Sequence, residues 1–456
     1  AYRLVGPRAR RGPTRCLPGI LTPMVGRAEE LETLLEAIQA LEREGRGRLV
    51  LVTGEAGIGK SRLVAEAMRR LEGPRILVAQ GASLSFTQNI GYWLVQQVLR
   101  SLFRVQEEVE EYPLLCARAR DLVGSAADDL LPYLLHLMGV EIRGEALAER
   151  LVHLEPAHLR QQTFLAVREF LAQVASHRPL LLILEDLHWV DRPSLDLLLF
   201  LLGLTRDAPL AVLGLSRPEG EAVQRIRAWA EEARAAPFVE VALDRLPPAD
   251  SDRLAAQLLQ TPRVPQAVRE WVVKRAEGNP FFMEELVRML MDRGLLRQVG
   301  GEWVWAGGDM GQVEAVPATL QALIAARVDS LAPTPREVIQ VAAVAGRSFS
   351  PRLLEEAVPQ ERRGAIRPAL AVLEERGLIT PEEGGEGVFT FRHGLIRDTV
   401  YGTLLQSTRQ DLHRRVGQAI EALYQAHLEE QAEVLAYHFS EARLAAKAIP
   451  YLLEAG

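Results

Sequence analysis

The feature that most limits what this chain can fold into is a strand, a loop and a helix between residues 49 and 70. The apolar run at 49–53 predicts a short buried strand, and residues 62–70 predict a helix. Between them, Gly54-Glu55-Ala56-Gly57-Ile58-Gly59-Lys60-Ser61 has the GxxxxGK[ST] spacing of a phosphate-binding loop. Glycines let successive N–H groups converge on a phosphate, and the helix N-terminus adds partial positive charge. The sequence therefore predicts a site for a nucleoside triphosphate.

Two side chains of this loop have predicted roles. Lys60 is placed to contact the β- and γ-phosphates, and the Ser61 hydroxyl is placed to bind Mg²⁺. A chance glycine-rich turn is the alternative, but it would not need the flanking strand and helix. Lys60 is moreover one of only three lysines in an arginine-rich chain. The predicted nucleotide contacts here are Gly54, Glu55, Ala56, Gly57, Ile58, Gly59, Lys60, Ser61 and, directly after the loop, Arg62.

Length and composition limit the remaining possibilities. A chain of 456 residues favours two to four domains. The net charge of −7 argues against a generally basic surface. Cys16 and Cys116 fit no disulfide or metal framework, and both are expected to be reduced in a cytosol. The longest apolar run, 197–202, is too short to span a bilayer, and no signal-peptide pattern is found. We expect a cytoplasmic protein and, from its start at Ala1 and end at Gly456, a segment of a longer one.

A second constellation follows about 125 residues after the loop. The apolar strand predicted at 179–184 ends in Glu185 and Asp186, as a Walker B strand does. A parallel strand covered on both faces is apolar throughout, and its C-terminal end faces the ligand crevice of an open α/β sheet. One acid can hold Mg²⁺ while the other orients or deprotonates the attacking water. Because this strand follows a phosphate loop, we predict that its two acids and the loop serve the same nucleotide.

The pattern around these motifs is α/β. A helix at 28–42, strands at 75–79 and 209–217 and a buried helix at 194–204 alternate along the chain. They predict a doubly wound parallel sheet over residues 23–244. Arg217, at the end of the last strand, is placed either as a sensor of the γ-phosphate or as an ordinary strand-end arginine. The aromatic and apolar residues between 92 and 103 are expected to pack in the core.

The flanking regions differ from this pattern. Residues 1–22 carry five arginines and no acid, which favours an extended linker over a nucleic-acid arm. Residues 245–310 predict a helical lid with a turn at Gly278-Asn279-Pro280. Residues 311–407 predict a winged-helix domain in which a protein contact is favoured over DNA, because the third helix is weakly basic. Residues 408–456 predict the start of TPR-like helical repeats.

Five motifs in one order resemble the STAND class of AAA-related signalling ATPases: residues 25–27, 54–61, 184–191, 278–280 and 391–393. More closely, the chain resembles the bacterial branch whose ATPase follows a class III adenylate/guanylate cyclase domain. A sister branch carries a LuxR-type domain, as in MalT-like regulators. The resemblance covers nearly the whole chain from residue 20 onward, and Glu185-Asp186-Leu187-His188-Trp189 is its most specific part.

The resemblance also implies roles for individual residues. Val25, Gly26 and Arg27 would lie beside the adenine and ribose. Glu185 would take the Mg²⁺ side and Asp186 the catalytic acid position, with Arg217 as the sensor. Pro280 would pack on the adenine, and His393 would contact the β-phosphate of ADP and lock the resting state. Glutamate before aspartate departs from the usual order of acids and makes slow hydrolysis plausible.

The expected function is therefore an ATP-hydrolysing signalling switch with ATP/ADP and Mg²⁺ as cofactors. ADP would hold a closed monomer, and ATP would promote assembly into a homo-oligomer after a signal at the C-terminal repeats. DNA would be contacted only through a domain outside these residues. Two alternatives remain: an AAA-type DNA remodeller that uses the winged helix, and a scaffold that binds nucleotide without hydrolysis.

Overall fold

The computed structural model describes residues 15–17, 20–21, 23–71, 75–83, 90–104, 111–140, 142, 151, 154–233, 238–259, 264–299, 302–307, 316–382, 387–425, 428 and 431–455. They fall into two compact units. The loop unit comprises Ala1–Glu32, Gly54–Glu72 and Leu243–Leu412, and the sheet unit comprises Thr33–Thr53, Gly73–Ala242 and His413–Gly456. Each unit is described by itself.

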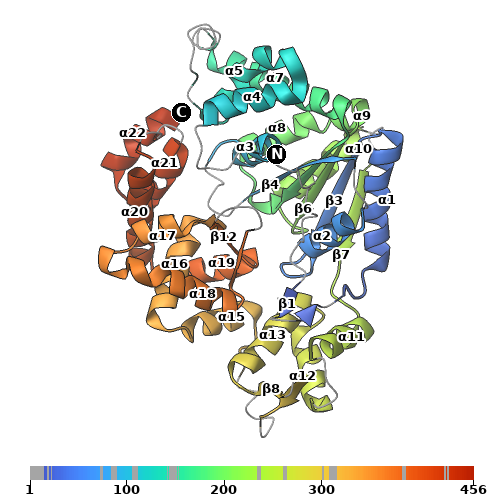
Figure 1. The fold of residues 1–456 in the computed structure, drawn as a ribbon. Coiled ribbons are helices and arrows are strands. Elements are labelled where there is room, and N and C mark those ends of the chain that lie inside the picture. Colours follow the sequence, from blue (N-terminus) through green and yellow to red (C-terminus); the bar gives the residue numbers. More distant parts are fainter. Residues whose placement is uncertain are drawn as a thin grey trace, which may run out of the picture. The chain divides into compact units, whose positions relative to one another are not determined.

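The sheet unit is built on a five-stranded sheet in the order β4-β5-β6-β3-β7 (Figure 1). Its strands are β3 (Arg48–Gly54), β4 (Leu77–Ala82), β5 (Leu180–Glu185), β6 (Leu210–Ser216) and β7 (Phe238–Leu243). The pairs β4–β5, β5–β6 and β6–β3 are parallel. In this register Glu185 lies opposite Ala82, and Thr53 lies opposite Ser216, so the carboxyl ends of four strands share one edge. The predicted α/β fold with a doubly wound parallel sheet is confirmed.

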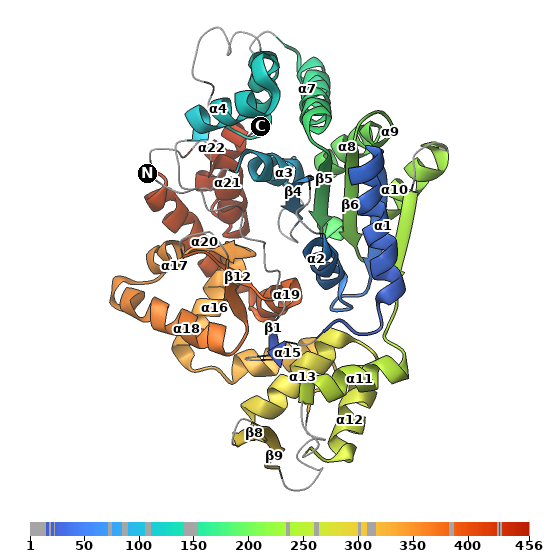
Figure 2. The same cartoon turned by 45° about the vertical axis from the view of Figure 1, so that its right-hand side comes forward.

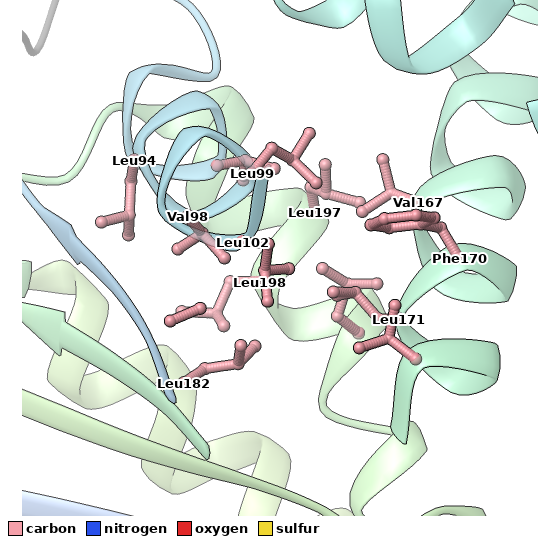
Figure 3. Packing of buried hydrophobic residues seen from close by; sticks show 14 of the residues in the cluster. Leu94, Val98, Leu99, Leu102, Val167, Phe170, Leu171, Leu182, Leu197 and Leu198 are labelled. Atoms are coloured by element: carbon pink, nitrogen blue, oxygen red, sulfur yellow. The ribbon is translucent and has the colours of Figure 1, made fainter. Parts of the chain in front are cut away.

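The strands are apolar because helices cover them. All seven residues of β6 are buried, as are the first five of β5. The core continues into α3 (Trp93–Phe103), α7 (Pro156–His177) and α8 (Arg192–Leu201). Figure 3 shows this packing in detail: Val98 and Leu102 of α3 face Leu198 of α8 above Leu182 of β5. Further helices of the unit are α4 (Glu111–Val123), η2 (Gly124–Ala126), α5 (Ala127–Leu137), η3 (Leu187–Trp189), α9 (Leu204–Asp207), α10 (Glu221–Ala233), α21 (Ala432–Glu441) and α22 (Ala445–Ala455).

One predicted strand is displaced along the chain. We expect it at 75–79, but β4 begins at Leu77. The reason is local, because the Arg178 guanidinium donates to the carbonyls of Arg75 (2.8 Å) and Ile76 (3.1 Å). Those two residues therefore hold the loop that precedes β5, and the ladder starts after them.

The loop unit contains α2 (Lys60–Arg70) and the three lid helices α11 (Pro248–Leu259), α12 (Gln266–Ala276) and α13 (Pro280–Asp292), followed by β8 (Leu296–Val299) and β9 (Glu302–Trp305). Figure 2 shows the lid helices gathered above the β8–β9 hairpin. Every residue of α13 from 281 to 290 is buried. A helix that is buried on all sides is central to its unit. The short strands β1 (Arg15–Leu17) and β2 (Ile20–Leu21) pair within the predicted linker.

The second half of the loop unit, residues 316–382 and 387–404, is here named the wing module. It contains α15 (Leu320–Asp329), α16 (Pro333–Ala345), β10 (Ser348–Phe349), α17 (Pro351–Glu356), η4 (Gln360–Ala365), α18 (Ile366–Glu375), β11 (Ile379–Pro381), β12 (Phe389–Phe391) and α19 (Gly394–Thr403). Its three strands pair in the order β10-β12-β11. Two further helices, α1 (Ala28–Glu44) and α20 (Gln406–Leu423), contain residues of both units. Over the described ranges, every helix is too short or too polar to cross a membrane.

Candidate functional site

The predicted phosphate loop begins where β3 ends and closes at the start of α2. Gly54, Gly57 and Gly59 have φ angles of 158°, 79° and 109°, which other residues rarely adopt. Gly59 is the N-cap of α2 and has no side chain with which to cap it. No acid occupies the first turn of α2. The exposed positive end of this helix therefore suits an anionic ligand.

Lys60 is held by the loop itself. Its ammonium donates to the carbonyl oxygens of Gly54 (2.8 Å) and Glu55 (3.0 Å). The charge thus lies over the loop whose N–H groups are expected to bind phosphate. Together with the Ser61 hydroxyl in the first turn of α2, the donor set fits a nucleotide with Mg²⁺.

The lid meets the loop through the start of α13. Asn279 is the N-cap of this helix, and its side-chain oxygen accepts from Phe282 N (3.1 Å). The amide nitrogen of the same side chain donates to Ala56 O (2.9 Å), and Phe281 N donates to Gly57 O (3.2 Å). A Cβ at Gly57 would lie 2.9 Å from Phe281 Cβ, so glycine is needed here for space as well as for its φ. The start of α13 therefore contacts the loop directly.

Charged side chains reinforce this contact. Arg62, the residue after Ser61, lies 3.4 Å from the Glu284 carboxylate on α13. Glu55 pairs with Arg245 (3.3 Å), and Arg245 pairs with Glu277 in the turn that leads to α13 (2.6 Å). The second set is half exposed and contributes little on its own.

His393 lies at the same end of α13. It is the N-cap of α19, where its Nδ1 accepts from Leu395 N (3.1 Å). Its ring stacks on Phe281 with centroids 4.3 Å apart and an interplanar angle of 16°. Pro280 is the first residue of α13, directly before Phe281. The loop unit thus brings together the phosphate loop, Pro280 and His393, three features that are far apart in the sequence.

Gly26 and Arg27, which are predicted to lie beside the adenine and ribose, contact neighbouring parts of the loop unit. The Arg27 side chain is buried, donates to Glu30 (2.9 Å) and also contacts the carbonyl of Asp244. Gly26 has a φ of 65°, and a Cβ there would overlap the Asp250 carboxylate. These contacts attach the segment before α1 to the start of α11.

The acidic pair lies in the sheet unit at the carboxyl edge of the strands. Glu185 ends β5, and its carbonyl accepts from Ser83 N (3.0 Å), the residue after β4. Asp186 has a left-handed φ of 56° and occupies the N-cap position of the short helix η3, without a capping hydrogen bond from its side chain. A non-glycine residue in this region costs of order 1 kcal/mol and is concentrated at functional sites.

Two residues that sequence reasoning left without a settled role hold this turn. Asp191 is 2% exposed and accepts from Ser194 N (2.8 Å) and Tyr92 N (2.9 Å). It caps α8 and ties that helix to the chain before α3, and burial raises the pKa of its carboxyl. The Arg217 guanidinium lies over the Trp189 ring, 5.8 Å from its centroid. The sheet unit thus brings Arg217 to the same turn as Glu185 and Asp186.

A group of charges lies along α13, here named the charge cluster: the buried Glu285 and Arg288 of α13 and Arg327 of α15, with the more exposed Asp292 of α13. Arg327 contacts Glu285 closely, pairs with Asp292 (3.1 Å) and donates to Arg376 O (2.6 Å). Burial alone would lower the pKa of Arg327, but the two carboxylates outweigh burial and raise it. For Arg288, burial and then Arg392 lower the pKa to about 10.

Sequence reasoning missed Asn279, Phe281 and Glu284 as neighbours of the phosphate loop. The turn at 278–280 was visible, and an asparagine before a proline is a common helix start. Which loop that asparagine reaches depends on tertiary packing, which the sequence does not display. Phe281 and Glu284 resemble ordinary helix residues in sequence.

Comparisons with known proteins agree with the loop and the sheet. Residues 23–213 match the family model of the AAA ATPase domain, and residues 248–298 match a domain of unknown function, DUF8739. An uncharacterized protein of Rhizobium meliloti (strain 1021) is 27% identical over 448 residues. That alignment covers 95% of this chain but 40% of the relative, so the chain spans less than half of that protein's length.

Among solved structures, a Signal Transduction ATPase with Numerous Domains (STAND) protein with a tetratricopeptide repeat sensor from Pyrococcus horikoshii aligns with 97% of this chain and 54% of its own, at 13% identity and a TM-score of 0.49. The ORC1 protein of Aeropyrum pernix, solved in complex with DNA, aligns with 84% of this chain and 93% of its own, at 12% identity and a TM-score of 0.39. The family match, the glycine loop and the parallel sheet lead to one conclusion: residues 23–213 form an AAA-related P-loop ATPase domain.

Proposed function

We propose that this protein is a nucleotide-dependent switch of the STAND type that binds ATP or ADP with Mg²⁺ and hydrolyses ATP slowly. The observation that carries the proposal is the contact chain from Gly57 to Phe281 to His393 within one compact unit. A loop that only binds nucleotide does not need lid and wing-module side chains against it. A switch does, because its ligand must bind two conformations with different affinity.

In the proposed site, Gly54 to Ser61 hold the phosphates through backbone N–H groups, with Lys60 neutralising their charge. In this loop, Ser61 would hold Mg²⁺. In the sheet unit, we propose Glu185 as the acid for Mg²⁺, Asp186 as the acid for the attacking water and Arg217 as the sensor of the γ-phosphate. Bound Mg²⁺-ATP supplies the phosphoryl group that is transferred to water. Arg217 stacks on Trp189, so its position depends on the turn that carries both acids.

In the proposed resting state, ADP lies between the phosphate loop, Pro280 and His393 and keeps the protein closed and monomeric. Exchange for ATP would release His393 and favour a homo-oligomer. The signal that triggers exchange and the output that follows would belong to regions beyond these residues, such as further helical repeats and a cyclase or DNA-binding domain.

The loop is tested by ADP titration of wild type and Lys60→Ala. We expect Lys60→Ala to lose most of its ADP and ATP affinity, because no other lysine is near this loop in sequence. Lys274→Ala, at another and exposed lysine, is the matched control and should bind as wild type does. Full ATP binding by Lys60→Ala would contradict the proposal.

The latch is tested by the rate of ADP release and by the oligomeric mass of His393→Ala. Faster release and a larger ATP-bound assembly are expected, whereas His158→Ala, at an exposed histidine, should change neither. Unchanged ADP retention and mass would reject the latch.

Hydrolysis is tested separately by single-turnover phosphate release with Mg²⁺ present. Slow release in wild type that is lost in Glu185→Gln supports the switch. ATP binding with no release in wild type would instead support a non-hydrolysing scaffold.

The DNA remodeller has little support, since Arg367 of α18 is paired with Glu355 (3.3 Å) and the chain carries a net charge of −7.

A further inference from the structure

Helix α13 presents two adjacent carboxylates to two different parts of the loop unit. Glu284 lies 3.4 Å from Arg62, which directly follows the proposed Mg²⁺ ligand Ser61. Glu285 contacts Arg327 on α15 of the wing module. Consecutive residues of a helix point about 100° apart, so the two acids must face different neighbours.

Each acid is accompanied by further contacts on its own side. On the loop side, Asn279 donates to Ala56 O and Phe281 N donates to Gly57 O. On the wing side, Arg288 donates to Arg376 O (3.4 Å), and Asp292 pairs with both Arg327 and Arg376. One helix therefore holds the phosphate loop at one end and the wing module along its length.

The surroundings leave α13 little freedom to move alone. Glu284 is 9% exposed, Glu285 1% and Arg327 4%, whereas the side chain of Arg62 is 27% exposed, so the pair on the wing side is the fully buried one. Buried ion pairs depend strongly on geometry, because a displaced partner leaves a charge away from water without compensation. A shift of α13 that keeps one acid paired must therefore carry the other acid and its partner with it.

We infer that α13 couples nucleotide binding to the position of the wing module, with Glu284 and Glu285 as positioning residues that act through Arg62 and Arg327. The inference rests on the proposed function, since it adds a mechanism to the same nucleotide site. Coupling is reciprocal: if the wing module alters ADP affinity, ADP alters the wing module to the same extent. Neither Arg327 nor Glu285 belongs to the phosphate loop. A change in ADP affinity when either residue is replaced therefore reports the coupling and not the loss of a loop contact.

The experiment measures ADP affinity and ADP release for the full chain with Arg327→Met and Glu285→Gln, each singly and together. We expect each single variant to change ADP affinity by about fivefold or more, which is the lower range of measured allosteric couplings. The double variant should resemble either single one, because both remove the same link. Arg336→Met is the matched control: Arg336 is another wing-module arginine, paired with an exposed acid, Asp329 (2.9 Å), and its loss should leave ADP binding unchanged.

A second measurement starts from the wild-type protein. Hydrogen exchange of wild type with and without ADP should show slower exchange in α15 when ADP is bound, and Glu284→Gln should reduce that protection. ADP binding that leaves α15 exchange unchanged, or Arg327→Met with wild-type ADP affinity, would overturn the coupling. Failure of wild type to bind ADP at all would instead overturn the proposed function, so the two failures are distinguishable.

Discussion

The interiors of the two units differ in the side chains that they bury. The sheet unit is filled by leucine, valine and phenylalanine from β5, α3, α7 and α8. At the centre of the loop unit, α13 instead buries Glu284, Glu285 and Arg288 among its apolar residues, and Arg327 of α15 is buried against them. Both interiors are mainly apolar, but that of the loop unit also contains buried pairs of opposite charge.

The difference has a physical consequence. Apolar burial is non-directional and scales with area, so a sheet core tolerates small shifts with gradual loss. A buried ion pair gains little net stability over an apolar replacement, but removal of one partner is strongly destabilising. We therefore expect the helices of the loop unit to adopt a small number of distinct arrangements. The sheet unit is expected to keep a single one.

The largest expected effect is in the charge cluster. Glu285→Ala should lower the unfolding free energy of the loop unit by about 3–5 kcal/mol, because Arg327 and Arg288 lose a buried counter-charge. Hydrogen exchange under increasing denaturant, measured on amides of α15, reports this loss. The double variant Glu285→Leu/Arg327→Leu should recover most of it, since a buried pair can be replaced by apolar groups. A double variant as unstable as Glu285→Ala would show that the two interiors do not differ in this way.

The sheet core provides the opposite test. Leu182 is 2% exposed at the centre of β5, and Leu182→Ala should cost about 2–5 kcal/mol through lost burial and a cavity. Unlike Glu285, Leu182 has no single partner whose removal would restore stability. Amide exchange of β5 against denaturant measures the cost. A second truncation at Leu198 that recovered stability would contradict the expectation.

A buried carboxyl group inside the sheet unit should lower the stability of the protein when it is charged. Glu433 of α21 accepts from Gln96 Nε2 (3.4 Å), and burial, together with nearby Asp191, raises its pKa from 4.5 to about 7. The unfolded carboxyl loses its proton near pH 4.5, while the folded one keeps it to about pH 7, so stability should fall between those values. Glu433→Gln should remove the fall and gain at most about 3 kcal/mol above pH 7.

Thermal unfolding between about pH 4.5 and 8 measures this difference. Glu441→Gln changes an exposed acid on the same helix and should follow the wild-type profile. If the Glu433→Gln profile falls over the same pH range as wild type, another group is responsible.

The smallest expected effect separates the two functions of Asn279. Asn279→Asp keeps the oxygen that caps α13 but cannot donate to Ala56 O, whereas Asn279→Ala loses both. We expect a loss of about 1 kcal/mol for the alanine variant relative to aspartate from the cap alone. Both variants should release ADP faster than wild type, by similar factors. Release at the wild-type rate in Asn279→Asp would show that the contact with Ala56 is not part of the latch.

Much of the fold follows from local rules that the sequence displays. The glycines at 54, 57 and 59 have the positive φ angles that only glycine adopts easily, and the apolar runs at 180–184 and 210–215 are buried strands. Proline at the first helical position of α13 agrees with the turn predicted at 278–280. Such features depend on near neighbours in the chain.

The rest depends on pairings between distant residues. Glu284 and Glu285 look in sequence like two solvated acids on a helix, yet each meets an arginine from a different segment. Asp191 is the last residue of the 184–191 motif, and its side chain caps α8. Neither periodicity nor composition records which arginine meets which acid, because that choice is made by tertiary packing.

Gly377 is a position at which the contact between α13 and the wing module can be altered by substitution. Its φ is 64°, and a Cβ at this position would overlap Arg288 Nη1. A single methyl group there would compete with the guanidinium for space without altering any charge. Alanine at position 377 would thus weaken the contact between the wing module and the lid in two ways, by displacing this guanidinium and by straining the backbone at a left-handed φ.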